Sequence, residues 1–210
     1  MTVPRAAGTL YLVPNLLGAV DPASALPQRT IAIARRLRHF VVETPKVARA
    51  FVRSLSSEHA LQDIVFAELN EHTPPGRVAA LLAPALAGED LGLASDAGCP
   101  GVADPGALLV AAAHRAGVRV VPLVGPSALL LALMASGMNG QCFAFHGYLP
   151  VRADARAAAL KTLDDAVART GATQLFIETP YRNEAVVAAV LRVCRAGTRF
   201  CVAADLTLPS

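Results

Sequence analysis

Residues 95–106 read Ser-Asp-Ala-Gly-Cys-Pro-Gly-Val-Ala-Asp-Pro-Gly and directly follow the apolar run at residues 91–94. This stretch places two acids, three glycines and two prolines behind a predicted buried strand. Glycine lets the backbone approach a ligand closely, and proline stiffens a loop. Composition alone also fits a tight turn between a strand and a helix. We interpret the stretch as a ligand-binding loop because a second loop of the same kind follows.

The second loop, Pro-Leu-Val-Gly-Pro-Ser-Ala at residues 122–128, follows the apolar run at residues 118–121. We expect residues 91–94 and 118–121 to be neighbouring parallel strands, so that both loops border one crevice at the carboxyl edge of the sheet. Open α/β sheets bind ligands at this edge. Neither loop contains Gly-x-Gly-x-x-Gly or Gly-Lys-Ser/Thr, which disfavours nicotinamide and nucleoside triphosphate chemistry.

Short strands alternate with helices along the chain, which indicates a parallel α/β sheet. The pattern changes near residue 125, and we expect two α/β domains, 1–122 and 123–210. In the first domain the expected strands are 10–13, 39–42, 64–68, 91–94 and 118–121, and the expected helices are 28–37, 47–55, 77–87 and 108–115. In the second domain the expected strands are 142–146, 174–177 and 199–203, and the expected helices are 129–135, 156–169 and 183–194.

The composition is apolar, with 54% hydrophobic residues and a mean hydropathy of +0.45. Very apolar parallel strands or a surface buried between subunits would explain this excess. A membrane span is disfavoured because prolines and glycines interrupt the longest apolar region, residues 118–138, whereas a spanning helix needs about 20 continuous apolar residues. We see no signal peptide and expect a cytoplasmic protein.

Cysteine and histidine do not suggest a metal site. The four cysteines contain no Cys-x-x-Cys pair, and the five histidines are isolated. This spacing argues against zinc and against a disulfide scaffold, so we expect reduced cysteines and no bound metal.

Arginine dominates the basic residues: of 19 lysines and arginines, only Lys46 and Lys161 are lysine. Arginine is the better partner for phosphate and for stacking, so a basic cluster in the first quarter of the chain is a candidate RNA-binding surface. A biased base composition of the gene or an ordinary solvated helix face explains the cluster equally well. Its members are Arg29, Arg35, Arg36, Arg38, Lys46, Arg49 and Arg53.

Six motifs occur in a defined order: Gly-Thr-Leu-Tyr-Leu-Val-Pro at 8–14, Val-Glu-Thr at 42–44, the loop at 95–106, Gly-Pro-Ser-Ala at 125–128, His-Gly-Tyr-Leu-Pro at 146–150 and Ile-Glu-Thr-Pro-Tyr-Arg at 177–182. Together they resemble the tetrapyrrole methylase superfamily of S-adenosylmethionine-dependent methyltransferases. Within it the match is nearest to the 16S ribosomal RNA ribose 2′-O-methyltransferase clade. The resemblance runs from residue 8 to about residue 207.

The resemblance implies two α/β domains with S-adenosylmethionine in the cleft between them, a homodimer, and ribosomal RNA as the acceptor. Asp96 would bind the ribose or the methionine ammonium of the cofactor, although an aspartate here also fits a cap on its own loop. The residues that the resemblance assigns to the cofactor are Pro14, Asp96, Ala97, Gly98, Val102, Ala103, Ser127 and Ala128.

A ribose hydroxyl must lose its proton on methylation, and a nearby base would assist. Candidates for this catalytic group are Glu43, His72 and Glu178, each of which also fits a salt bridge or a cap. Lys46, Arg49 and Arg182 are candidates for substrate binding, with a structural salt bridge as the alternative for Arg182.

Two segments depart from the clade's pattern. The clade reads Thr-Pro-Ile-Gly-Asn-Leu after the first strand and Glu-Asp-Thr-Arg after the second, where this chain has Asn-Leu-Leu-Gly-Ala-Val at 15–20 and Glu-Thr-Pro-Lys at 43–46. Family members also continue beyond the last predicted strand, so we expect the second domain to be truncated. These departures concern the acceptor and not the cofactor. The alternatives are a tetrapyrrole methyltransferase, a cofactor-binding protein without catalysis, and an unrelated α/β enzyme.

Overall fold

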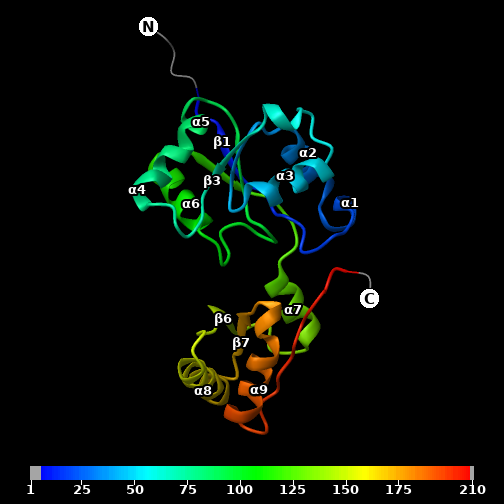
Figure 1. Ribbon diagram of the computed structural model, residues 1–210, viewed down its shortest axis with the longest axis vertical. Coiled ribbons are helices and arrows are strands. Elements are labelled where there is room, and N and C mark those ends of the chain that lie inside the picture. Colours follow the sequence, from blue (N-terminus) through cyan, green and yellow to red (C-terminus); the bar gives the residue numbers. More distant parts are fainter. Residues whose placement is uncertain (1–5, 209–210) are drawn as a thin grey trace. The chain divides into compact units, whose positions relative to one another are not determined.

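The computed structural model describes residues 6–208 (Figure 1). This part of the chain divides into two compact units by its contacts. Unit 1 extends to Ser127 and includes Thr207 and Leu208, whereas unit 2 spans Ala128–Leu206. These units are defined by contacts alone. The division into two domains after residue 122, expected from the sequence, therefore stays a prediction.

Within the described residues of unit 1, five parallel strands form one sheet in the order β3-β2-β4-β1-β5. Its central strand β4 is buried at all four positions, which matches the continuous apolar pattern expected of a strand covered on both faces. The strands are β1 (Thr9–Leu12), β2 (His39–Val42), β3 (Val65–Glu68), β4 (Leu91–Ala94) and β5 (Arg119–Pro122).

The expected adjacency of residues 91–94 and 118–121 is wrong. Both strands are parallel, but β1 lies between them and pairs with each, with Leu10 opposite Leu91 on one side and Val120 on the other. Sequence pattern identifies a buried strand but not its neighbour, which depends on how the crossover connections pack. The loops that follow β4 and β5 therefore flank the loop that follows β1.

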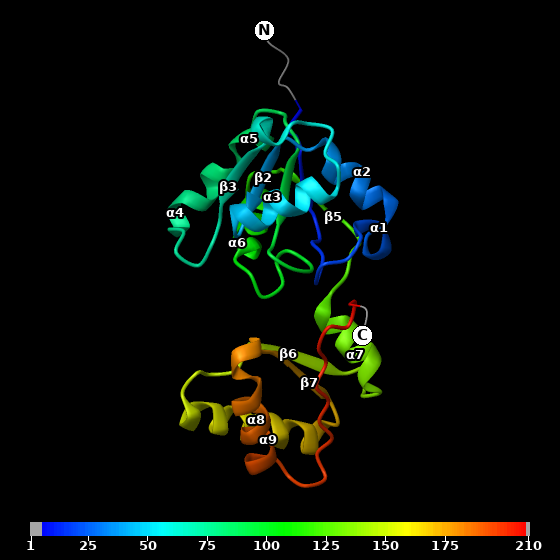
Figure 2. The same ribbon diagram turned by 45° about the vertical axis from the view of Figure 1, so that its right-hand side comes forward.

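Helices cover both faces of this sheet, with α2 and α3 on one side and α4, α5 and α6 on the other (Figures 1 and 2). One core cluster joins Phe40 and Val42 to Phe51 of α3, and the other joins Leu10 and Leu93 to α6. The helical segments of unit 1 are α1 (Pro22–Ala25), α2 (Gln28–Arg36), α3 (Pro45–Ser54), η1 (Leu61–Asp63), α4 (Pro75–Val78), η2 (Ala79–Leu82), α5 (Ala83–Leu86) and α6 (Gly106–Arg115).

The expected helix at residues 77–87 is three short pieces, α4, η2 and α5. Pro84 lies in the first turn of α5. Proline donates no backbone hydrogen bond and its ring clashes with the preceding turn, so a continuous α-helix cannot run through this position without distortion.

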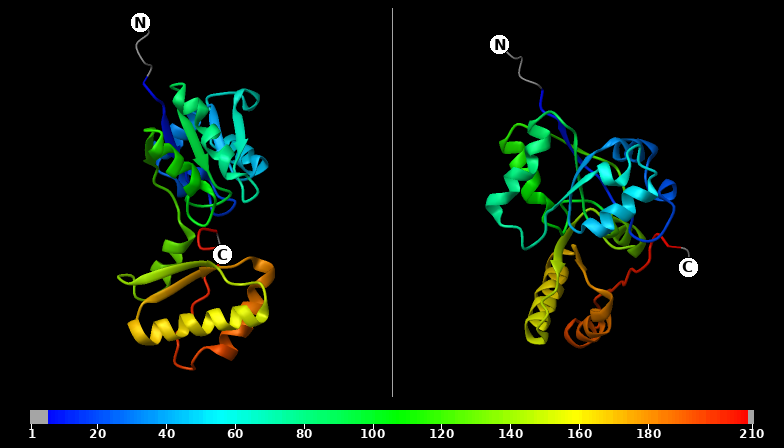
Figure 3. Two further views of the ribbon diagram at one scale, coloured as in Figure 1. Left: turned by 90° about the vertical axis from the view of Figure 1, so that its left-hand side faces the viewer. Right: turned by 45° about the horizontal axis from the view of Figure 1, so that its top comes forward.

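Unit 2 contains a two-stranded parallel sheet in which β6 pairs with β7. Figure 3 shows the strands side by side above the long helix α8. A small core joins Leu149 and Leu160 to Val186 and Val190 of α9. The elements are α7 (Ala128–Ser136), β6 (Phe143–Tyr148), α8 (Ala153–Thr170), β7 (Thr173–Ile177), η3 (Pro180–Arg182) and α9 (Asn183–Val193).

The expected strand at residues 199–203 is wrong, because this segment pairs with neither β6 nor β7. In place of strand pairing, the ring of Phe200 stacks on Phe176 of β7, with 6.5 Å between ring centroids. A strand requires a partner for its backbone hydrogen bonds, and an apolar run alone does not supply one. As to membrane insertion, no helix in residues 6–208 combines the length and apolar character needed to cross a bilayer.

Two adjacent leucines of α6 provide a stability test. Leu109 is fully buried in a core cluster, whereas the side chain of Leu108 is 50% exposed. We expect Leu109→Ala to lower the free energy of unfolding by about 2–5 kcal/mol, since it leaves a cavity. Leu108→Ala should change it by about 0.5 kcal/mol or less. Urea unfolding followed by circular dichroism compares the two, and equal losses would contradict the assigned packing.

Candidate functional site at the carboxyl edge of the first sheet

All five strands of the sheet in unit 1 are parallel, so their carboxyl ends lie along one edge. The loops after β1, β2, β4 and β5 are joined there by hydrogen bonds between side chains and backbone. They carry most of the residues that the sequence assigned to cofactor and acceptor.

Asn15 joins the loop after β1 to the loop after β4. Its backbone N–H donates to the carbonyl of Gly98 at 2.9 Å, and Gly98 donates back to Asn15 at 3.2 Å. The side-chain amide of Asn15 also donates to the carbonyls of Ser95 and Asp96, at 3.1 Å and 3.0 Å. Asn15 is 5% exposed, so this buried amide fixes the path of both loops.

Asp96 joins the loop after β4 to the loop after β2. Its Oδ1 accepts the backbone N–H of Thr44 at 3.1 Å, and its Oδ2 accepts the Thr44 hydroxyl at 2.7 Å. The backbone N–H of Asp96 points in turn at Oε2 of Glu43, 3.5 Å away. Asp96 thus bonds across to a neighbouring strand end, so the predicted cap on its own loop is not what its carboxylate forms.

Asp104 organises the second half of the 95–106 loop. Its carboxylate accepts the N–H of Gly101 at 2.9 Å and that of Gly106 at 2.7 Å. Between them Val102 and Ala103 are exposed, and Ala103 has a φ of 62°, which is costly for a residue with a Cβ. The loop therefore turns its acids inward and presents backbone and small side chains outward.

The loop after β5 packs closely on the loop after β1. A Cβ on Gly125 would lie 2.3 Å from Cβ of Pro14, so only glycine fits at this approach. The hydroxyl of Thr30 donates to the carbonyl of Val124 at 2.8 Å, and Sγ of Cys99 contacts the carbonyl of Pro126 at 3.4 Å.

The structure thus brings most of the cofactor candidates to one edge of unit 1. Asp96, Ala97, Gly98, Val102 and Ala103 lie on the loop after β4. Pro14 lies on the loop after β1, Ser127 ends the loop after β5, and Ala128 begins unit 2.

Glu43 stands among other acids at this edge. Burial is the main cause that raises the pKa of the Glu43 carboxyl, and the negative charges of Asp96, Asp104 and Glu71 raise it further, against the hydrogen bond from the Asp96 N–H. Burial also raises the pKa of Asp104, partly offset by its bonds to Gly106 and Gly101. A carboxylate with a raised pKa is a better proton acceptor than an ordinary one.

The other candidates of unit 1 are exposed. His72 lies in the loop after β3 with Nε2 3.5 Å from Glu71, and both side chains are more than four-fifths exposed. Lys46 and Arg49 project from α3 into solvent, and the guanidinium of Arg49 lies 5.3 Å from the ring centroid of Phe66.

Glu178 and Arg182 are engaged with each other in unit 2. Glu178 Oε2 lies 3.0 Å from Arg182 Nη2, and their side chains are only 7% and 14% exposed. This contact is an ion pair by distance but lacks hydrogen-bond geometry at Oε2. Arg182 also donates to the carbonyls of Leu149 and Pro150, at 2.9 Å and 3.2 Å. These contacts favour the structural salt bridge over substrate binding for Arg182.

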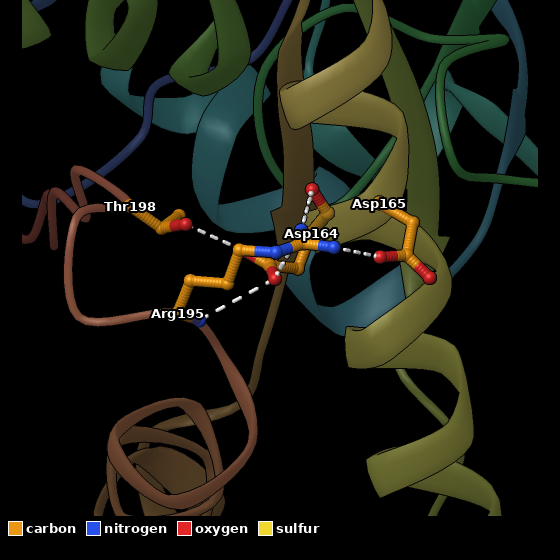
Figure 4. A network of polar contacts seen from close by, with 4 residues as sticks. All are labelled: Asp164, Asp165, Arg195 and Thr198. Atoms are coloured by element: carbon orange, nitrogen blue, oxygen red, sulfur yellow. Dashed lines mark hydrogen bonds and ion pairs between the residues drawn. The ribbon is translucent and has the colours of Figure 1, made fainter.

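Unit 2 also holds a cavity of about 450 Å³ between α8, β7 and the segment after α9. At its polar end Asp164 bonds to Arg195 and Thr198, and Arg195 also pairs with Asp165 (Figure 4). The Thr198 hydroxyl, more than Arg195, lowers the pKa of Asp164. Because these polar groups satisfy one another, we place the candidate site at the loops of unit 1 and not in this cavity.

A metal centre is a separate question. Among residues 6–208, no three or more His, Cys, Asp or Glu side chains are grouped so that they could hold a metal ion.

The sequence interpretation missed three residues that build the site: Asn15, Thr44 and Asp104. Each is a short polar residue just after a strand or before a helix. That position signals a local turn or cap and gives no indication of a bond to another loop. Only the order of the strands shows which loops meet.

The chain is similar in sequence to several curated proteins. Over 181 residues the chain is 34% identical to the ribosomal RNA small subunit methyltransferase I of Vibrio cholerae serotype O1, which covers 86% of this chain and 59% of that protein. Over 186 residues it is 38% identical to the protein of the same name from Micromonospora olivasterospora, covering 89% and 56%. The chain therefore spans less than two thirds of the length of these relatives. No protein-family model matches the chain.

Solved structures agree in fold. The methyltransferase CobJ matches with a TM-score of 0.60 and 19% identity, over 91% of this chain and 78% of that one. The uroporphyrin-III C-methyl transferase of Thermus thermophilus, complexed with S-adenyl homocysteine, matches with a TM-score of 0.54 and 18% identity, over 90% and 78%.

These similarities define an α/β protein with the fold of the matched methyltransferase structures. Over most of its own length the chain is similar in sequence to the ribosomal RNA small subunit methyltransferases I.

The raised pKa of Glu43 predicts how stability depends on pH. The folded state holds this proton more tightly than the unfolded state, whose pKa lies near 4.5. The Glu43 contribution therefore stabilises the fold as the pH falls through the raised value, and destabilises it at neutral pH. The advantage of Glu43→Gln over the wild type in urea unfolding should shrink between pH 7 and pH 4. An advantage that grows would contradict the assignment, and Glu184→Gln on α9 is the matched control.

Proposed function

We propose that this chain forms part of a methyltransferase that transfers the methyl group of S-adenosylmethionine to a ribose 2′-hydroxyl of ribosomal RNA. The observation that carries the proposal is the joined set of loops after β1, β2 and β4, held by Asn15 and Asp96. Sequence similarity to proteins named ribosomal RNA small subunit methyltransferase I also supports the proposal.

The residues at this edge fit the cofactor. Asp96 and Asp104 are satisfied within the loops, which leaves backbone groups and the small side chains of Ala97, Val102 and Ala103 facing out. Such a surface accommodates a flat purine and an apolar chain, with specificity from a few polar groups. The bound nucleoside of the Thermus thermophilus neighbour is consistent with this fit.

S-adenosylmethionine, when bound, would supply an electrophilic methyl group with a neutral thioether as the leaving group. The chain's own residues then have to hold the acceptor in line, exclude water and take up the hydroxyl proton. Among the three candidates for the base, the position and raised pKa of Glu43 favour it. His72 is exposed, and Glu178 is paired with Arg182.

The basic side of α3 is the candidate RNA contact. Lys46, Arg49 and Arg53 recur at spacings of three and four residues, so they share one helix face, and all three are exposed. Lys46 lies two residues after Thr44, at the same carboxyl edge as the bonded loops. A cationic face beside the site would bind the phosphates of an RNA acceptor.

Two alternatives remain from the sequence. A tetrapyrrole acceptor is suggested by a solved structure of the same fold, the uroporphyrin-III C-methyl transferase. Against it, α3 offers phosphate-binding side chains and not a large apolar pocket. A cofactor-binding protein without catalysis would bind S-adenosylmethionine but methylate neither acceptor.

Helix α7 supports the expected homodimer. All its residues from Ala128 to Ala135 are apolar, and Leu130 and Met134 are 52% and 78% exposed. An exposed helix that is apolar on every side is typical of an interface. A dimer and a cytoplasmic location, where ribosomes assemble, remain predictions.

Cofactor binding is tested by enlarging one small side chain of the 95–106 loop. Ala97 is exposed, so Ala97→Leu should retain the fold while obstructing the site. We expect S-adenosylmethionine to bind the wild type, and Ala97→Leu to bind at least about tenfold more weakly by isothermal titration, a loss of about 1.4 kcal/mol. Ala111→Leu, on the exposed side of α6, is the matched control. Equal affinity of all three proteins would place the cofactor elsewhere.

RNA binding is tested by removing charge from α3. Lys46→Gln with Arg49→Gln should weaken binding to a ribosomal RNA fragment and lower the magnitude of the salt slope by about 0.7–0.9 for each phosphate that is no longer neutralised. Fluorescence anisotropy at several salt concentrations gives both quantities. Arg77→Gln, an exposed arginine of α4 on the opposite face of the sheet, is the control. An unchanged slope in the double variant would remove α3 from the RNA-binding surface.

A further inference from the structure

Thr44 does not perform the role that its position predicts. It is the N-cap residue of α3, followed by Pro45 in the first turn, yet its side chain makes no capping hydrogen bond to that helix. A threonine at this position typically accepts a backbone N–H of the first helical turn and so stabilises the helix. The hydroxyl is instead directed across the sheet edge to Asp96.

Asp96 receives both donors that Thr44 can offer, one on each carboxylate oxygen. Val42 and Ala94 are the last paired residues of adjacent strands, so Thr44 and Asp96 lie just beyond the end of that ladder. Two backbone N–H groups there have no ladder partner. The carboxylate of Asp96 satisfies one of them, and the carboxylate of Glu43 approaches the other, on Asp96 itself.

We propose that Thr44 and Asp96 are a positioning pair, which holds the Glu43 carboxylate in place to accept the proton of the methylated hydroxyl. The inference rests on the proposed function for the reaction, but the pair itself is a property of this chain. It also changes the expected role of Asp96, whose carboxylate acts on the loop after β2 and not as a ligand of the cofactor.

The charges around Glu43 suit this role. The charges of Asp96 and Asp104 on the loop after β4, and of Glu71 on the loop after β3, each add to the effect of burial in raising the pKa of Glu43. Three neighbouring negative charges favour proton uptake by Glu43. The two bonds from Thr44 fix the position of the Asp96 carboxylate, so this group stays beside Glu43.

The O–H bond of the acceptor breaks and its proton moves to Glu43, while the hydroxyl oxygen forms a bond to the methyl carbon. The carbon–sulfur bond breaks and its electron pair stays on sulfur, which becomes a neutral thioether. Thr44 and Asp96 touch neither reacting atom.

The central experiment compares Thr44→Val with Thr44→Ser. Valine keeps the branched shape but removes the hydroxyl, whereas serine retains it. We expect Thr44→Val to lower kcat by at least about tenfold, since general base catalysis contributes about 10²–10⁴-fold. Its S-adenosylmethionine affinity should stay within about twofold of the wild type. Thr44→Ser should restore most of kcat. Equal kcat in Thr44→Val and wild type, or a parallel loss of cofactor affinity, would overturn the proposal.

A second measurement needs neither cofactor nor RNA. Carboxyl NMR should show a lower Glu43 pKa in Asp96→Asn than in the wild type, because a neighbouring negative charge is removed. Amide exchange at Thr44 should be slow in the wild type and faster in Asp96→Ala, which removes its acceptor. An unchanged Glu43 pKa and unchanged exchange would refute the pair. If the wild type fails to bind S-adenosylmethionine while these effects are present, the proposed function fails and the pair stands.

Discussion

The candidate site depends on how backbone groups are satisfied where parallel strands end. Beyond Val42 and Ala94 the ladder between β2 and β4 stops, and unpaired N–H groups would face a partly buried edge at a cost in free energy. The carboxylates of Asp96 and Glu43 accept two of these N–H groups, and the side-chain amide of Asn15 donates to two carbonyls at the same edge. The same bonds that complete the backbone therefore bring three loops together and set the charges at their centre.

Unit 2 uses a related solution with a different result. Arg182 donates to two carbonyls after β6 while its charge is paired with Glu178. Here the charged side chains pair with each other and hold the loop after β6 to the segment after β7. Neither is available to bind an RNA acceptor. In unit 1 the Glu43 carboxylate accepts a long hydrogen bond from the Asp96 N–H and has no cationic partner among residues 6–208. The cationic partner Arg182 beside Glu178, and the negative charges beside Glu43, separate the two glutamates as candidate bases.

Much of the fold was predictable because the relevant signals are local. The five strands of unit 1 and the helices at residues 28–37, 47–55 and 108–115 follow from apolar periodicity, and the structure confirms them within a few residues. The expected helix at 77–87 is broken at Pro84, where a local proline signal prevails over the apolar periodicity. The expected strand at 199–203 is wrong for a nonlocal reason, since Phe200 stacks on Phe176 and the backbone gains no partner.

The sequence by itself determined the α/β class, the two ligand-type loops and the resemblance to methyltransferases, because glycine, proline and apolar spacing act within a few residues. Tertiary structure alone decided that β1 separates β4 from β5, that the Thr44 hydroxyl bonds to Asp96 and does not cap its helix, and that Arg182 donates to the carbonyls of Leu149 and Pro150. Each of these depends on hydrogen bonds between residues distant along the chain. Which residues become hydrogen-bond partners depends on the strand order and on the packing of the helices. A local sequence pattern predicts neither.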